Sequence, residues 1–93
     1  MLFIDLVKEK VQPIVKIKGY ALIKESKTVE PDSAAYIVFF KLYHRLTISQ
    51  VDSNENHNIY TVTLNNKKLL EVDIDEVGTE TALASIVDKV SKI

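Results

Sequence analysis

Side chains able to do chemistry are few in this sequence, and they lie far apart. The two histidines, His44 and His57, have no carboxylate at metal-ligand spacing, so the metal signal is weak. Asp73 and Asp75 are two residues apart in an alternating segment, so both would point to one side of a strand and could share a cation. The alternative is that they form the solvated face of an edge strand and protect it from aggregation.

Motifs for nucleophilic catalysis and for phosphate binding are absent. The sequence has no cysteine, no G-x-S-x-G and no HExxH. Its two glycines, Gly19 and Gly78, are too far apart to build a phosphate-binding loop. We therefore expect a protein that is not an enzyme, with no catalytic residues, no cofactor and no metal.

Opposite charges are nearly balanced in number but separated along the chain. Twelve Lys and Arg face thirteen Asp and Glu, and Arg45 is the single arginine, which argues against a dedicated nucleic-acid binder. Carboxylates concentrate between residues 71 and 80, and lysines in the first third, at Lys8, Lys10, Lys16, Lys18, Lys24 and Lys27. Two interpretations stay open: solvated faces, or a molecule whose two ends attract each other between copies.

Length and composition predict one globular domain over residues 1–93. Hydrophobic residues make up 46% and charged residues 27%, an ordinary globular composition. The longest apolar run, 34–40, is under half of the roughly 18 residues that a membrane span needs. No signal-peptide pattern is present, and there is no cysteine. We expect an intracellular protein with no membrane partner.

The N-terminal third predicts a helix and then a strand. Apolar residues recur at helical spacing over 3–12, and Pro13 is expected to end or kink the helix. The apolar period then changes to two over 15–24, which predicts a strand with Gly19 as a bulge or close approach. The polar segment 25–33, with Pro31, predicts a loop.

Residues 35–50 predict one long central strand. Its second half alternates strictly, and its first half is β-branched or aromatic. His44 falls on the apolar face, which indicates a buried or half-buried structural histidine; the alternative is a pH-sensitive contact. His57 falls in a polar turn over 52–58, where we expect it to be solvated.

The C-terminal third predicts a hairpin and a helix. Alternating segments at 60–64 and 70–75 flank Asn65 and Asn66, which tolerate the positive φ of a tight turn. Apolar spacing then predicts a helix from Thr79, a plausible N-cap, to the end. The expected fold is α+β, an antiparallel four-stranded sheet with the N- and C-terminal helices on one face.

Two sets of residues follow from this fold. The expected core contains Phe40, Leu42, Leu46, Val62, Val72, Leu83 and Val87. Part of the second sheet face is expected to be apolar and exposed, and exposed apolar patches on small proteins usually mark contacts. The alternative is that the loop 25–34 folds over this face and the protein is monomeric. The expected interface residues are Tyr20, Leu22, Phe39, Tyr43, Asp73, Asp75, Lys16 and Lys18.

The order of elements resembles the small tail-terminator and tail-completion proteins of tailed bacteriophages. The resemblance is carried by residues 3–12, 31–38 (PDSAAYIV), 70–75 (LEVDID) and 79–90, and it is one of pattern, without a residue-specific motif. It implies a ring-forming structural subunit at the head–tail junction, in the host cytoplasm or the virion, with no catalytic residues. Small phage inhibitors share a similar build. The double-stranded-RNA-binding domain does too, but that fold places lysines where this C-terminal helix begins with Gly78, Thr79 and Glu80.

Three functions are therefore open, and we favour the first. The first is an assembly subunit that binds protein and forms a homo-oligomer. The second is a nucleic-acid-binding accessory protein that uses lysines of the segment 8–27. The third is a monomeric inhibitor that docks its acidic hairpin into a basic groove of a host protein and so mimics a phosphate backbone.

Overall fold

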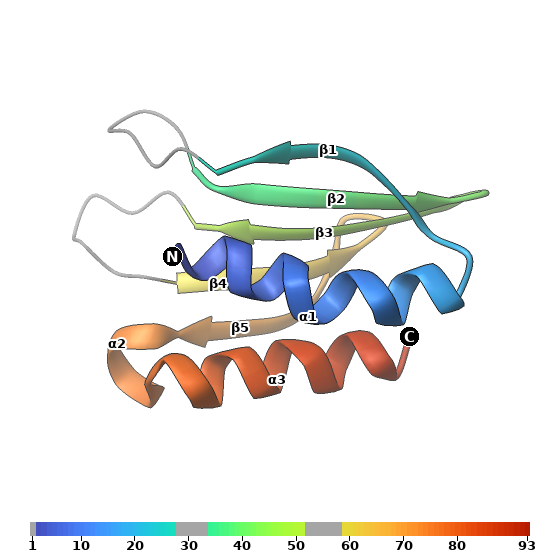
Figure 1. The fold of residues 1–93 in the computed structure, drawn as a ribbon. Coiled ribbons are helices and arrows are strands. Elements are labelled where there is room, and N and C mark those ends of the chain that lie inside the picture. Colours follow the sequence, from blue (N-terminus) through green and yellow to red (C-terminus); the bar gives the residue numbers. More distant parts are fainter. Residues whose placement is uncertain (1, 28–33, 52–58) are drawn as a thin grey trace.

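The protein is an α+β domain built on one antiparallel sheet of five strands, with a helix at each end of the chain. A computed structural model describes residues 2–27, 34–51 and 59–93. The elements are α1 (Phe3–Ile17), β1 (Ala21–Ser26), β2 (Tyr36–Lys41), β3 (His44–Gln50), β4 (Ile59–Leu64), β5 (Lys67–Asp73), α2 (Ile74–Val77) and α3 (Thr79–Ser91). The strands are neighbours in chain order, β1-β2-β3-β4-β5 (Figure 1).

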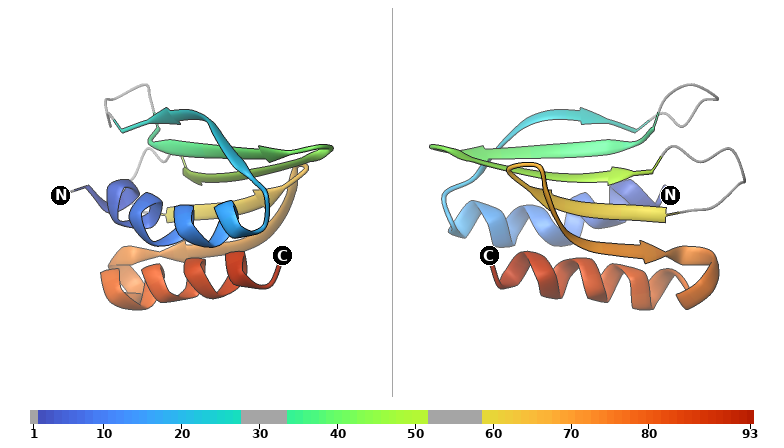
Figure 2. Two further views of the ribbon diagram at one scale, coloured as in Figure 1. Left: turned by 45° about the vertical axis from the view of Figure 1, so that its right-hand side comes forward. Right: turned by 180° about the vertical axis from the view of Figure 1, so that it is seen from behind.

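The two long helices lie side by side on one face of the sheet. The sheet curves around them, and both helices run in the same direction (Figures 1 and 2). The predicted fold class and the placement of the helices are confirmed, whereas the predicted four strands are wrong. No helix in the described parts of the chain is long and apolar enough to cross a membrane.

The fifth strand arises because the predicted strand 35–50 folds back on itself. Leu42, with φ of 50°, and Tyr43 form a two-residue turn, and Lys41 pairs with His44. In one continuous strand, the residues that face the same side would all have odd numbers or all have even numbers. The turn inverts this phase, because the residues that face the helices have odd numbers in β2 and even numbers in β3. Phe39 and Leu46 therefore face the helices together, as register partners.

This inversion corrects three predictions. Phe40 and Leu42 are 42% and 74% exposed, so neither belongs to the core. Phe39 is fully buried, so it is not an exposed interface residue. His44 is exposed, not buried or half-buried, because it stands beside the turn and not inside a continuous strand.

Helix α1 continues past Pro13, which was expected to end or kink it. Proline costs a helix about 3 kcal/mol because it removes one hydrogen bond and crowds the preceding turn. The buried stripe of the helix runs through this position to Val15, and Pro13 itself is on the exposed side. Packing of that stripe outweighs the local cost. The predicted strand 15–24 therefore begins only at Ala21, after Gly19 with φ of 93°.

The C-terminal third is close to its prediction. Asn65 and Asn66 have φ of 51° and 68°, the positive pair that a two-residue hairpin turn requires. Strand β5 ends at Asp73, because the Asp73 carboxylate accepts the backbone N–H of Asp75 at 2.9 Å and starts the short helix α2. The N-cap of α3 is Gly78, not Thr79.

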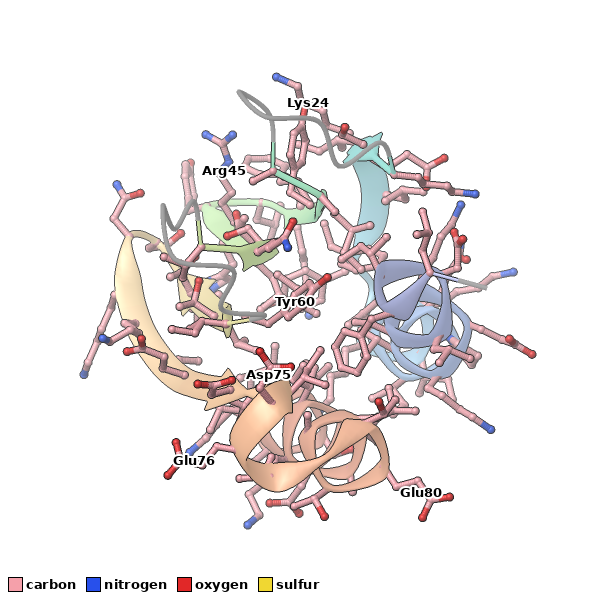
Figure 3. The ribbon with its side chains drawn as sticks, turned by 90° about the vertical axis from the view of Figure 1, so that its left-hand side faces the viewer. Lys24, Arg45, Tyr60, Asp75, Glu76 and Glu80 are labelled. Carbon is pink, nitrogen blue, oxygen red and sulfur yellow. The ribbon has the colours of Figure 1, made fainter. Side chains whose placement is uncertain are left out.

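The core lies between the sheet and the two helices. Tyr60 points into this space in Figure 3, and its ring lies 4.7 Å from that of Phe3 on α1. Of the predicted core, Leu46 and Val62 are fully buried, and Val72, Leu83 and Val87 are partly buried against it. Most of the predicted loop 25–33 and the polar turn 52–58, with His57, lie outside the described residues.

Truncation of Phe39 and of Phe40 tests the strand phase. We expect Phe39→Ala to lower the free energy of unfolding by about 3–5 kcal/mol, the cost of a large core cavity. Phe40→Ala, at a half-exposed neighbour of the same size, should cost well under half of that. Urea denaturation midpoints measure both. An equal loss, or a larger one for Phe40→Ala, would show that the phase is wrong.

Ionisation of Tyr60 should destabilise the fold at alkaline pH. Burial raises the pKa of its phenol above 10.0, because the charged form is desolvated. The unfolded state then loses its proton at lower pH than the folded state, so stability is complete below about pH 10 and falls as pH rises toward the folded pKa. Tyr60→Phe lacks this proton. Its stability should decline less steeply than that of the wild type between about pH 9 and 11 in thermal melts; parallel declines would contradict the assignment.

Candidate protein-binding surfaces

Exposed apolar side chains gather at the two ends of the molecule. Its long axis measures 36 Å. Among the described residues, the large exposed apolar side chains are Leu2, Ile17, Ile23, Phe40, Leu42, Tyr43 and Val77. Leu2 and Val77 lie at the end where α1 and α3 begin, whereas Ile17, Leu42 and Tyr43 lie at the opposite end (Figure 1). Only Ile23, in β1, lies away from both ends and from the β2–β3 hairpin.

The end where both long helices finish carries mostly positive charge, and we call it the basic end. It comprises the last residues of α1 and α3 and the β2–β3 and β4–β5 turns, with Lys16, Lys18, Lys41, Arg45, Lys67, Lys89 and Lys92. Two of these lysines bind backbone carbonyls near helix termini. Lys18 Nζ donates to the carbonyl oxygen of Ile93 at 3.0 Å, and Lys41 Nζ donates to that of Lys18 at 2.6 Å. Cations are favoured here because the helix dipoles end in unpaired carbonyls.

The turn residues Leu42 and Tyr43, which we call the hairpin tip, project into solvent from a fixed base. Tyr43 is 90% exposed and Leu42 74%. On one side of the base, the Arg45 N–H donates to Asn65 Oδ1 at 2.8 Å, and the Asn65 N–H donates to the Arg45 carbonyl at 3.0 Å. On the other side, Lys41 reaches the end of α1 and lies 5.8 Å from the centre of the Tyr20 ring. The base of the tip is therefore joined by hydrogen bonds to neighbouring segments on both sides.

The backbone at the hairpin tip is strained. Leu42 has φ of 50°, a conformation that costs a residue with a side chain about 1–2 kcal/mol and that hairpin turns normally assign to Gly or Asn. Strain of this kind concentrates at functional sites. An exposed leucine in a strained turn is thus a candidate contact residue.

A shallow hollow of about 250 Å³ opens between α1 and β1, in the half of the molecule nearer the basic end. It is lined by Gln12, Val15, Lys16, Tyr20, Ala21, Leu22 and Phe39, and we call it the α1–β1 hollow. Four predicted interface residues, Lys16, Tyr20, Leu22 and Phe39, thus do come together. They do not form a second sheet face as expected, since Leu22 and Phe39 are cross-strand partners on the side that packs on the core.

The sheet face away from the helices is largely polar. Thr47 pairs with Thr63 and Ser49 with Thr61, and the hydroxyls of Ser49 and Thr61 lie 3.4 Å apart. Such residues are solvated without cost. In β2 this face is apolar, because Tyr36, Val38 and Phe40 pair with Ser49, Thr47 and Arg45 and share their side of the sheet. Val38 is buried and Phe40 half-exposed, so the expected apolar part of this face is confined to β2.

The opposite end, where α1 and α3 begin, is acidic, and we call it the acidic end. It comprises α2 and its neighbours, with Asp73, Asp75, Glu76 and Glu80. Glu76 and Glu80 point away from the core in Figure 3. Asp73 and Asp75 do not share a strand face, because Asp75 belongs to α2. Among the described residues, no three His, Asp or Glu side chains come close enough together to hold a metal ion.

The lysines of the segment 8–27 do not form one patch. Lys8 pairs with Glu25 at 2.6 Å, and this hydrogen bond lowers the pKa of the Glu25 carboxyl. Lys27 lies 3.3 Å from Asp5, and Lys24 lies over the ring of Tyr36. Lys16 and Lys18 are at the basic end. The surface needed for the predicted nucleic-acid site is therefore dispersed.

Comparisons with known proteins identify no relative. No protein-family model matches the chain, and neither a curated protein nor a solved structure matches it. The candidate surfaces therefore rest on geometry, exposure and charge.

Replacing Leu42 tests the strain at the hairpin tip. Leu42→Gly should relieve about 1–2 kcal/mol of backbone strain and lose about 0.5–1 kcal/mol to the entropy of the unfolded chain. We expect a net gain in unfolding free energy of about 0.5–1 kcal/mol by urea denaturation. Asn66→Ala, at the other positive-φ turn, should instead be destabilising. A loss of stability in Leu42→Gly would contradict the strained turn.

Proposed function

We propose that the protein is a non-enzymatic assembly subunit whose copies bind head to tail, the basic end of one against the acidic end of the next. The observation that carries the proposal is the pairing of features at the ends. Each end presents exposed apolar side chains beside an excess of one charge, although Lys27 pairs with Asp5 at the acidic end and Asp88 with Lys92 at the basic end. The two excess charges are opposite. The basic end of one copy thus complements the acidic end of another copy, whereas two basic ends or two acidic ends do not complement each other.

Magnitudes favour a contact of moderate strength. Burying an exposed Leu, Ile or Val contributes about 1.5–3 kcal/mol, and the two ends together offer five large apolar side chains. Association costs about 4–15 kcal/mol in lost freedom of motion. Exposed ion pairs add at most about 1 kcal/mol each but orient the partners. These terms largely offset one another, so we expect one contact to be weak and to depend on protein concentration and salt.

A head-to-tail contact repeats, and it closes into a ring if the rotation between copies allows. Ring closure would make the assembly far tighter than one contact, because each copy is then held twice. Such a ring would agree with the resemblance in element order to phage tail-terminator proteins, and on that ground the proposal includes a ring component at the head–tail junction of a phage virion, assembled in the host cytoplasm. Small-molecule cofactors and membranes have no part in the proposal.

The carboxylates on α2 support one second candidate. Asp75 and Glu76 on α2 and Glu80 at the start of α3 share one end of the molecule, with Glu76 and Glu80 pointing outward on different sides (Figure 3), and this end would face a basic groove of a host protein. A monomeric inhibitor would use this end alone, so the hairpin tip would be dispensable for it. Solution mass separates the two functions.

Light scattering behind size exclusion tests self-association. At about 100 µM protein and low salt, we expect a species larger than the 10.5 kDa chain, which dissociates as salt screens the ends. Tyr43→Asp at the hairpin tip should give monomer without loss of fold. Ile23→Asp, an equally drastic change at an exposed site away from both ends, is the matched control and should leave the assembly intact. A monomeric wild type, or equal dissociation of both variants, would contradict the proposal.

Nucleic acid should bind weakly. The basic end contains a single arginine, and the remaining lysines of the segment 8–27 are dispersed or paired. At about 150 mM salt we expect dissociation constants for DNA and RNA no tighter than about 10⁻⁶ M, measured by fluorescence anisotropy. A complex tighter than about 100 nM would instead favour a nucleic-acid accessory function.

A further inference from the structure

The α1–β1 hollow lies in the half of the molecule nearer the basic end, and the exposed Val77 lies at the acidic end. Neither the space in the hollow nor the exposed part of Val77 is filled or covered by the described residues. We infer that Val77 of one copy enters the α1–β1 hollow of the next, with Glu76 placed against Lys16. The inference rests on the proposed head-to-tail assembly and assigns the residues of its contact.

Val77 is presented as a projecting side chain. It is the last residue of the short helix α2 and is 43% exposed, although it is aliphatic. The following Gly78 has φ of 88°, and a side chain built at that position would meet no atom within 4 Å. The corner between α2 and α3 is therefore unobstructed. Glu76 precedes Val77 and points away from the core (Figure 3), so an apolar group and a carboxylate are displayed together.

The hollow has the matching size and chemistry. Its volume of about 250 Å³ lies below the range of small-molecule pockets, about 300–1,000 Å³, and suits a single aliphatic side chain. Tyr20 and Leu22, both partly exposed, supply its apolar wall, and the buried side chains of Val15 and Phe39 lie beneath it. Lys16 is exposed at its rim, and none of the described carboxylates pairs with it.

The hollow also adjoins the hairpin tip. Tyr20 lines the hollow, and Lys41, next to the tip, lies over the ring of Tyr20. A partner whose α2 sits in the hollow therefore meets a second lysine close by. The apolar insertion supplies affinity, and the charges set which end is accepted.

Reversing one charge at each end provides a direct test. Lys16→Glu gives a chain with a carboxylate on both surfaces, and Glu76→Lys gives a chain with a lysine on both. We expect each variant alone to self-associate at least tenfold more weakly in sedimentation velocity. Mixed in equal amounts, they should assemble in alternation, because each surface then meets its opposite. The double variant should assemble alone. Lys10→Glu, at an exposed site on α1 outside the hollow, should behave as the wild type.

The outcomes separate this inference from the proposed function. If the wild type assembles and both reversals leave assembly unchanged, the assignment is overturned while head-to-tail assembly stands. Folded single variants that dissociate but do not recover on mixing also overturn it. A wild type that stays monomeric removes the proposed function itself. Val77→Ser, which keeps every charge, should weaken assembly at least tenfold; no change there would equally reject the insertion.

Discussion

The number of reversals in the sheet is the constraint on which the rest of the molecule depends. An odd number of antiparallel strands between α1 and α3 makes the two helices run in the same direction. Four strands would have reversed α3 and placed opposite helix ends side by side, where their dipoles cancel. With five, both N-termini lie at one end and both C-termini at the other, so carboxylates are stabilised at the first and lysines at the second. The strained turn at Leu42 thus determines the charge axis of the molecule.

The same constraint explains where contact surfaces can form. The helices and the inner sheet face bury each other, and the outer face of β3 and β4 carries threonine and serine. Unburied apolar residues remain mainly at the ends, where chain reversals leave side chains such as Tyr43 and Val77 without cover. Helix dipoles account for the sign of the charge at each end, but they do not require apolar side chains there. That coincidence of charge and apolar exposure is what favours binding over simple solvation.

The sequence predicts those parts of the fold that have a local chemical cause. Asn65 and Asn66 identify their turn because both tolerate positive φ, and the apolar spacing of α3 identifies its helix. The Leu42–Tyr43 turn has no glycine or asparagine to identify it. A two-residue turn also leaves the alternation of apolar and polar residues uninterrupted, so the sequence predicts the wrong sheet face for Phe39 and Phe40. Pro13 predicts the wrong end for α1, because the packing that stabilises the helix beyond this residue comes from distant segments of the chain. The α1–β1 hollow joins segments that only the fold brings together, and no sequence pattern indicates it or the exposure of Val77.

Cysteine cross-linking tests the central claim most directly, because the chain has no cysteine of its own. Gln12→Cys places a thiol in the α1–β1 hollow, and Val77→Cys places one on α2. Under mild oxidation, a mixture of the two variants should give a disulfide-linked species of twice the 10.5 kDa chain mass, while each variant alone stays uncross-linked. Efficient cross-linking of Val77→Cys with itself, or none in the mixture, would contradict a head-to-tail contact between these surfaces.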